Sequence, residues 1–276
     1  MRGRRAVWMA VLASVGLVGC SDDGGSGFAY KKGLPFSEPK EFHSENGVTS
    51  VQLLSKETAV DISDATVKGT VYNGAFVGPT LHVAPGETLR VHLQNDLKQH
   101  TNIHYHGMHV SPEGNSDNIF LMIEPGESFD YQLDIPADHD VGTFWYHSHS
   151  HMDSESQVFG GLSGVLIVDG LEQKLPEAYR GITQHVFALK DLQVKDGTII
   201  ADNINSDAPT VRTVNGLVEP TLEIAPGETQ LWRLANISAD IFYDLSFATQ
   251  PLVVIAEDGN PVEKLWTAMD SGPAAR

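Results

Sequence analysis

The sequence of 276 residues contains a single cysteine, Cys20, so it can form no internal disulfide. Basic residues are also scarce, because 18 Lys and Arg stand against 36 Asp and Glu, giving a formal net charge of −18. A surface of that sign repels phosphate backbones, so the composition argues against a nucleic-acid partner. It attracts cations, metal ions included, although the same charge also serves ordinary solubility.

Long hydrophobic runs are missing as well. The apolar run at residues 6–18 is shorter than the roughly 20 residues that a membrane-spanning helix needs. Three arginines precede it, at positions 2, 4 and 5. A charged start followed by a short apolar run is typical of an export signal.

The end of this run, Leu17-Val18-Gly19-Cys20, resembles the lipobox of bacterial lipoproteins. The resemblance implies that residues 1–19 are a signal peptide and that Cys20 is acylated once the signal is removed. Residues 20–29, rich in Ser, Asp and Gly, would then form a flexible tether. We therefore expect an exported chain, lipid-anchored at the periplasmic or outer face of a bacterial membrane. The alternative is a free or buried thiol at Cys20.

No amphipathic helix of ordinary length is evident in the sequence. Apolar segments are short, rich in β-branched residues and separated by Gly and Pro, of which there are 26 and 14. This pattern predicts strands at residues 70–77, 88–93, 128–135 and 164–168. Strands at such spacing predict an all-β chain built of antiparallel sandwiches.

An internal repeat indicates two copies of one domain. Pro79-Thr-Leu-His-Val-Ala-Pro-Gly-Glu-Thr88 recurs as Pro220-Thr-Leu-Glu-Ile-Ala-Pro-Gly-Glu-Thr229, and beyond it Asn95 recurs as Asn236. A strand, a Pro-Gly turn and a second strand therefore occur twice. Chance is a poor explanation for a match of this length.

The repeat predicts a first domain at residues 30–172 and a second at residues 173–276. The second copy has far fewer residues after its Pro-Gly turn than the first. A sandwich without its last strands would leave sheet edges unpaired. We therefore expect the second domain to be incomplete at its C-terminus.

Seven of the twelve histidines lie between residues 104 and 151. Two tight pairs stand out, His104-Tyr-His106 and His147-Ser-His149. Residues two apart on a strand share a face, about 7 Å apart along the chain, so each pair presents two imidazoles on one side. Imidazole binds copper, zinc, iron and nickel, so the ligand type does not choose the metal. One such pair also suits a solvated strand face, but two pairs beside aromatics favour a metal site.

The two pairs stand in segments that resemble the first two copper motifs of multicopper oxidases, Thr101-Asn-Ile-His-Tyr-His-Gly107 and Gly142-Thr-Phe-Trp-Tyr-His-Ser-His149. Gly160-Gly-Leu-Ser-Gly-Val-Leu-Ile-Val-Asp169 resembles the strand that closes the first cupredoxin domain of that family. The resemblance extends over roughly residues 45–265. It implies tandem cupredoxin-like Greek-key β-sandwiches, the second truncated, with copper as the cofactor.

The resemblance also implies a set of ligands. His104 would bind the type 2 copper, and His106, His147 and His149 would bind the type 3 pair. Asp117 lies in the loop where some members keep an acidic residue that helps deliver protons to oxygen, which implies a proton donor.

The remaining histidines receive no ligand role. His109 and His151 have none that the resemblance transfers, and Trp145 and Tyr146 are expected to pack beside the site. Six more histidines receive no role from their spacing: His43, His82, His92, His100, His139 and His185.

The sequence departs from the family pattern in its second half. Complete members carry two further motifs in their last domain, one of which supplies the cysteine thiolate of the type 1 copper. Here no histidine follows His185 and no cysteine follows Cys20. The chain thus holds four of the eight histidines of a trinuclear cluster and lacks a type 1 site.

Three hypotheses about function follow. By resemblance, the family couples one-electron oxidation of a reducing substrate to reduction of oxygen to water, and this chain would be an inactive N-terminal fragment of such an oxidase. The first alternative is a copper-binding lipoprotein that buffers or delivers metal without turnover. The second is one half of a split oxidase, whose partner chain supplies the missing C-terminal domain.

Overall fold

The computed structural model describes residues 11–13, 28–201, 208–245, 253–267 and 269–271. Cys20 lies outside the described residues, as do most of the expected signal peptide and tether. Their roles therefore remain predictions. Within the described residues, no helix is both long and apolar enough to cross a bilayer.

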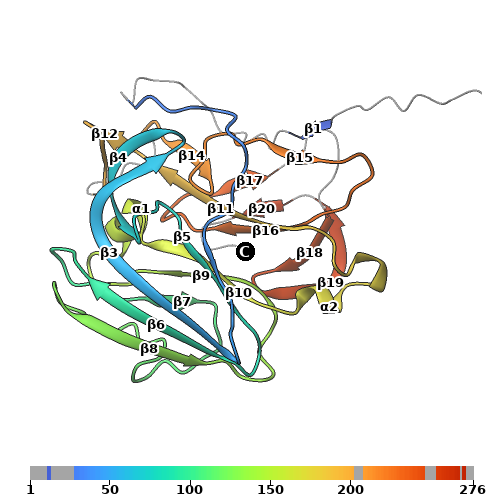
Figure 1. The fold of residues 1–276 in the computed structure, drawn as a ribbon, viewed down its shortest axis with the longest axis horizontal. Helices are drawn as coiled ribbons and strands as arrows, with labels where there is room; N and C mark the ends of the chain where they lie inside the picture. The colour runs from blue at the N-terminus through green and yellow to red at the C-terminus, as the bar shows by residue number, and fades with distance from the viewer. Residues whose placement is uncertain (1–10, 14–27, 202–207, 246–252, 268, 272–276) are drawn as a thin grey trace, which may run out of the picture.

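Two facing sheets form the larger part of the molecule (Figure 1). In spatial order the first contains β12 (Val194–Lys195), β13 (Thr198–Ile199), β4 (Ala65–Tyr72), β3 (Val48–Ile62), β6 (Thr88–Asn95) and β8 (Ser128–Asp134). The second contains β2 (Glu41–Phe42), β5 (Gly78–Val83), β10 (Ser163–Val168), β9 (Gly142–His147) and β7 (His104–His106). Leu53 and Leu93 of the six-stranded sheet and Tyr146 and Leu166 of the five-stranded sheet lie in one buried core.

Smaller sheets make up the rest. One has the order β14 (Val211–Val214), β11 (Gln184–Leu192), β16 (Leu231–Asn236). The two-stranded pairs are β1 (Val11–Ala13) with β15 (Leu222–Ile224), β17 (Tyr243–Leu245) with β20 (Met269–Ser271), and β18 (Val253–Glu257) with β19 (Asn260–Thr267). The helical elements are short: α1 (Ser154–Gly160), α2 (Leu171–Lys174) and a 3₁₀ turn at Glu177–Tyr179. This mostly β architecture confirms the predicted fold class.

The sheets are mixed, whereas the sequence predicted antiparallel ones. β3 runs parallel to β6, and β5 runs parallel to β10, because crossover connections separate the members of each pair. The remaining neighbours of β6 and β10 in their sheets, β8 and β9, are antiparallel to them.

The internal repeat is present in three dimensions. β4-β3-β6 and β14-β11-β16 share one pattern, an antiparallel neighbour followed by a parallel one. Both Pro-Gly turns close in the same way, since Glu87 accepts a hydrogen bond from the backbone of Ala84, and Glu228 from that of Ala225, each at 2.8 Å. The repeated ten residues therefore encode one strand-turn-strand unit.

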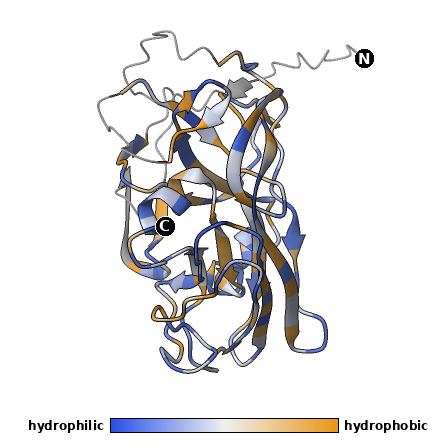
Figure 2. Cartoon of the chain, turned by 90° about the vertical axis from the view of Figure 1, so that its left-hand side faces the viewer, coloured by the Kyte–Doolittle hydropathy of each residue, from blue (hydrophilic) through white to orange (hydrophobic). Residues whose placement is uncertain are grey.

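Most of the strands predicted from the sequence are present in the structure. The expected strands at 88–93, 128–135 and 164–168 correspond to β6, β8 and β10. Residues 70–72 of the strand expected at 70–77 lie in β4, but the expected end was wrong, because β4 ends at Tyr72 and a turn follows in which Asn73 and Gly74 have φ of 51° and 75°. The long β3 was not predicted; along it buried and exposed residues mostly alternate, as the hydropathy colours of the long strands indicate (Figure 2).

A short segment of each predicted domain pairs with strands or loops of the other. Thr198 pairs with Lys68, which adds β12 and β13 to the six-stranded sheet. In the other direction, Lys32 forms a bridge with Val218. The boundary near residue 172 therefore remains a prediction.

The outer face of the five-stranded sheet packs against the second repeat. Trp145, Val165 and Ile167 share a buried cluster with residues of β11 and β16, such as Ala188 and Ala235. Side chains at the two edges of that outer face are covered less completely, and histidines occupy both edges.

Candidate metal centre

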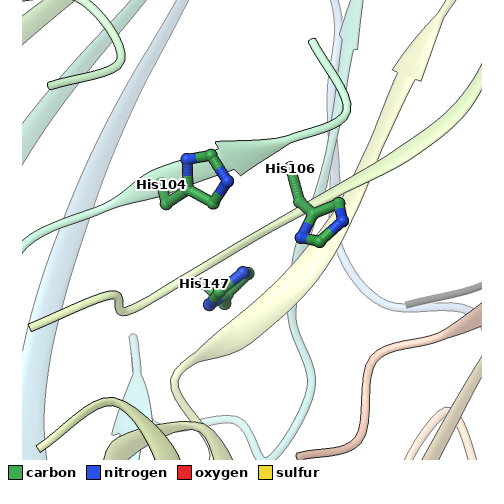
Figure 3. Close-up of side chains that lie close together, drawn as sticks. All are labelled: His104, His106 and His147. Carbon is green, nitrogen blue, oxygen red and sulfur yellow. The ribbon is translucent and has the colours of Figure 1, made fainter. Parts of the chain in front are cut away.

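Three histidines converge at the β7 edge of the five-stranded sheet (Figure 3). In the antiparallel pair of β7 and β9, His104 lies opposite His147 and His106 lies opposite Trp145. Opposed residues share a face, and so do residues two apart, so all three imidazoles project to one side. One nitrogen of each lies within 4.8 Å of one nitrogen of each of the other two.

His147 is the most buried of the three. Burial lowers its pKa well below the usual value, which keeps the ring neutral. Its Nδ1–H donates to the carbonyl of Ser148 at 2.7 Å, and its buried Nε2 has no hydrogen-bond partner among the described residues. The ring stacks on Trp145 at 4.1 Å between centroids. A neutral imidazole with an unshared Nε2 lone pair is the form that binds a metal ion.

His104 is oriented by Asp117. The Nδ1–H of His104 and the backbone N–H of Tyr105 both donate to Oδ1 of Asp117, each at 2.9 Å. A carboxylate on Nδ1 leaves Nε2 as the ligand atom and makes it more basic. The Asp117 side chain is only 11% exposed. The geometry thus gives Asp117 a positioning role, while its expected role as proton donor remains a prediction.

His149 reaches the site differently from the way the sequence suggested. β9 ends at His147, so His149 lies in the following loop and the strand-face reasoning was wrong for this pair. Its ring centroid is nonetheless 5.4 Å from that of His104 and 6.0 Å from that of His147. Its backbone N–H donates to Oδ1 of Asn102 at 2.8 Å, which fixes the start of the loop.

A buried polar network supports this loop, and the sequence reasoning missed it. Oε1 of Gln157 accepts hydrogen bonds from the hydroxyls of Thr101, at 2.7 Å, and Ser148, at 2.6 Å. Its Nε2 donates to the carbonyl of His100 at 2.9 Å. Gln157 belongs to α1, so this helix ties the segments before β7 and after β9 together. The sequence offered little signal for it, because Gln157 follows the polar residues Ser154, Glu155 and Ser156.

Trp145 packs beside the histidines as expected, whereas Tyr146 does not, because it projects from the opposite face of β9. Tyr146 is fully buried in the core, and its hydroxyl donates to the carbonyl of Pro79 at 2.7 Å. His151 is exposed, and the backbone N–H of His109 donates to Nε2 of His139.

The three converging residues fit a metal ion. They offer one imidazole oriented by a carboxylate, one buried neutral imidazole with an unpartnered nitrogen, and a third beside them. An all-imidazole set suits copper as well as zinc or nickel. The geometry therefore supports a metal centre.

Comparison with known protein families identifies the class. The family model described as multicopper oxidase matches residues 55–173, and a second model of the same description matches residues 178–269. The chain belongs to the multicopper oxidase family. The family binds copper, so the histidine cluster is the place where this member could hold it.

Relatives in sequence include multicopper oxidase mco of Staphylococcus aureus, 29% identical across 82% of this chain and 51% of that protein. Copper resistance protein A of Escherichia coli is 33% identical across 80% of this chain and 36% of that protein. The chain therefore spans about half the length of the first of these relatives and about a third of the length of the second.

Solved structures of multicopper oxidases have the same fold as this chain. A multicopper oxidase from Campylobacter jejuni superimposes with a TM-score of 0.75 at 23% identity, covering 89% of this chain and 53% of that one. A multi-copper oxidase from Pseudomonas thermotolerans gives a TM-score of 0.70 at 27% identity, covering 83% and 56%. The fold is thus that of part of a multicopper oxidase.

Proposed function

We propose that this chain supplies the first half of the oxygen-reducing copper cluster of a multicopper oxidase. The observation that carries the proposal is the convergence of His104, His106 and His147, with the Nε2 of His147 buried and unpartnered among the described residues. His104 would hold the type 2 copper, while His106, His147 and His149 would belong to the type 3 pair. Copper bound there would accept single electrons and pass them to oxygen.

The protein contributes position and protection from solvent. Asp117 fixes the ring of His104 through Nδ1, and Trp145 covers one face of His147. The Gln157 network holds the loop that carries His149. These groups would keep the ligand nitrogens in place before metal arrives, which lowers the cost of ordering them on binding.

Electron entry needs a further group. A type 1 copper requires a thiolate, and the sole cysteine of the sequence is Cys20. We therefore propose that the type 1 site, and the remaining cluster ligands, come from residues beyond these 276, in a further domain or a partner chain. Oxygen and a reducing substrate are the reactants that family membership implies.

A second candidate function is copper buffering or delivery without turnover. Two observations favour it: the net charge of −18, and the 33% identity to a protein named for copper resistance. A negative surface raises the local concentration of cations around the histidine cluster.

Oxygen uptake separates the two functions. The copper-loaded full chain would be supplied with a phenol, alone and mixed with the C-terminal half of the S. aureus relative. The oxidase proposal predicts uptake only in the mixture, abolished by His147→Ala and unaffected by the surface change His92→Ala. Copper binding without uptake in either sample would favour buffering. Uptake by the chain alone would contradict the need for an external type 1 site.

A further inference from the structure

A second cluster of metal-binding side chains lies at the opposite edge of the five-stranded sheet. The edge strand β2 runs parallel to β5, with Phe42 beside Leu81, so the next residue, His43, comes beside His82. The two rings lie 4.3 Å apart between centroids and 31° from parallel. Nε2 of His43 is 3.1 Å from Oε2 of Glu41. One ligand atom of each of Glu41, His43 and His82 lies within 4.8 Å of the other two.

His82 is prepared for a ligand in the way that His104 is. Its Nδ1 lies 3.0 Å from Oδ1 of Asp169, and its buried Nε2 has no hydrogen-bond partner among the described residues. Asp169 follows β10 directly, and its backbone N–H donates to the carbonyl of Val83 at 2.9 Å, so the carboxylate is held in place. A carboxylate that accepts Nδ1–H fixes the tautomer in which Nε2 carries the free lone pair. That nitrogen lies 3.9 Å from Oε1 of Glu41.

The surroundings favour a cation. These side chains line a pocket of about 330 Å³. Four carboxylates line it, and the one guanidinium among the lining residues, that of Arg233, is 3.8 Å from Glu172 and donates to Gln184 at 3.0 Å. With four carboxylates and one guanidinium, the lining is rich in negative charge. The four carboxylates are those of Glu38, Glu41, Asp169 and Glu172.

The site is also accessible. The side chain of His43 is 58% exposed and that of Glu41 is 36% exposed, whereas His82 is 13% exposed. A metal ion with bond lengths of about 2.0–2.2 Å needs its ligand atoms closer together than 4.8 Å. The two exposed side chains can make that adjustment by small rotations, while the sheet and Asp169 hold His82 as the fixed ligand.

We propose that Glu41, His43 and His82 form a second, independent metal site that takes a divalent transition-metal ion. Two imidazole nitrogens and one carboxylate oxygen exclude Mg²⁺ and Ca²⁺, which prefer oxygen ligands alone. Among the first-row metals such a set binds Cu²⁺ most tightly. Water in the pocket would complete the coordination, so the ion would exchange with solvent from the edge of β2.

Copper titration of the full chain tests the site. Equilibrium dialysis against Cu²⁺ would count bound ions and their affinities in the unaltered chain and in variants. His43→Ala and Glu41→Gln change exposed side chains and should leave the fold intact, as circular dichroism would verify. Each should remove one copper per chain or weaken one class of site at least tenfold. His82→Ala should do the same.

The matched control is His92→Ala. Nδ1 of His92 lies 2.7 Å from Oδ1 of Asp130, so it forms a similar His–Asp pair, but it belongs to neither described group of converging metal ligands. This variant should bind as much copper as the unaltered chain. Copper stoichiometry and affinity unchanged by both His43→Ala and Glu41→Gln would overturn the proposal. Because those changes spare the cluster at His104, the result does not depend on whether that cluster binds copper.

Discussion

Oδ1 of Asp117 accepts hydrogen bonds from Nδ1 of His104 and from the backbone N–H of Tyr105, at 2.9 Å each. One carboxylate oxygen therefore fixes both the strand that carries the histidine pair and the ring at its start. This contact links a loop thirteen residues away in sequence to the orientation of a proposed metal ligand.

Replacing Asp117 should lower the affinity of the histidine cluster for copper. Asp117→Ala frees the His104 ring and removes the group that makes its Nε2 more basic. Copper affinity of the histidine cluster should fall about 10- to 100-fold, measured by competition with a chelator. Asp130→Ala, which removes the surface partner of His92, is the control and should change nothing. Equal affinities in both variants would mean that Asp117 does not orient a ligand.

The Gln157 network predicts a stability effect. Gln157→Leu removes the buried acceptor of the Thr101 and Ser148 hydroxyls and one of two donors to the carbonyl of His100, which keeps the hydroxyl of Ser150. The free energy of unfolding should fall by about 1–3 kcal/mol, measured by urea unfolding. Gln52→Leu, at an exposed position of β3, is the matched change and should cost little. A similar small effect at both positions would argue against the network.

Lys190 predicts a pH dependence of stability. It is fully buried, and its Nζ donates to the carbonyl of Val158 at 2.6 Å and to Oγ of Ser163 at 2.9 Å. Burial lowers its pKa to about 7, against an ordinary 10.5. Between those values the unfolded chain binds one proton more than the folded chain. The free energy of unfolding should therefore rise with pH by up to about 1.4 kcal/mol per unit.

The difference in the free energy of unfolding between the unaltered chain and the Lys190→Met variant isolates the contribution of Lys190. Urea unfolding at pH 7 to 9 should show a rising difference, because only the unaltered chain has the lysine. Measurements should stop near pH 10, since buried tyrosines such as Tyr72 have a raised pKa and reverse the trend. A difference that is flat from pH 7 to 9 would mean that Lys190 keeps its proton in the folded state.

The lipobox resemblance at Cys20 predicts that the chain is anchored to a membrane by a lipid. If the lipobox resemblance reflects processing, the full chain expressed in a Gram-negative host should incorporate labelled palmitate and sediment with membranes. Cys20→Ser should abolish labelling and release the chain into the soluble fraction, while Ser21→Ala should leave both unchanged. Palmitate-free, soluble protein from the unaltered sequence would refute the anchor.

The sequence predicted the convergence of the histidines where regular strand geometry applied. His104 and His106 share a face because β7 is a strand, and the two-residue period is enough to say so. The same rule failed for His147 and His149, because β9 ends between them and the loop conformation depends on Asn102 and Gln157. Those contacts join residues about 50 positions apart, and no local pattern reports them.

The second cluster was missed for a related reason. Glu41 and His43 are separated from His82 by about 40 residues, and only the parallel pairing of β2 with β5 brings them together. One signal was available: the internal repeat has His82 in its first copy and Glu223 in its second.

The most direct test of the account is copper binding at the His104 cluster. The full chain and its His147→Ala variant would be titrated with Cu²⁺ and followed by electron paramagnetic resonance, with His92→Ala as the control. The account predicts nitrogen-ligated copper whose signal from this cluster is lost in His147→Ala and retained in His92→Ala. Identical spectra and affinities for all three proteins would show that the converging histidines do not bind copper.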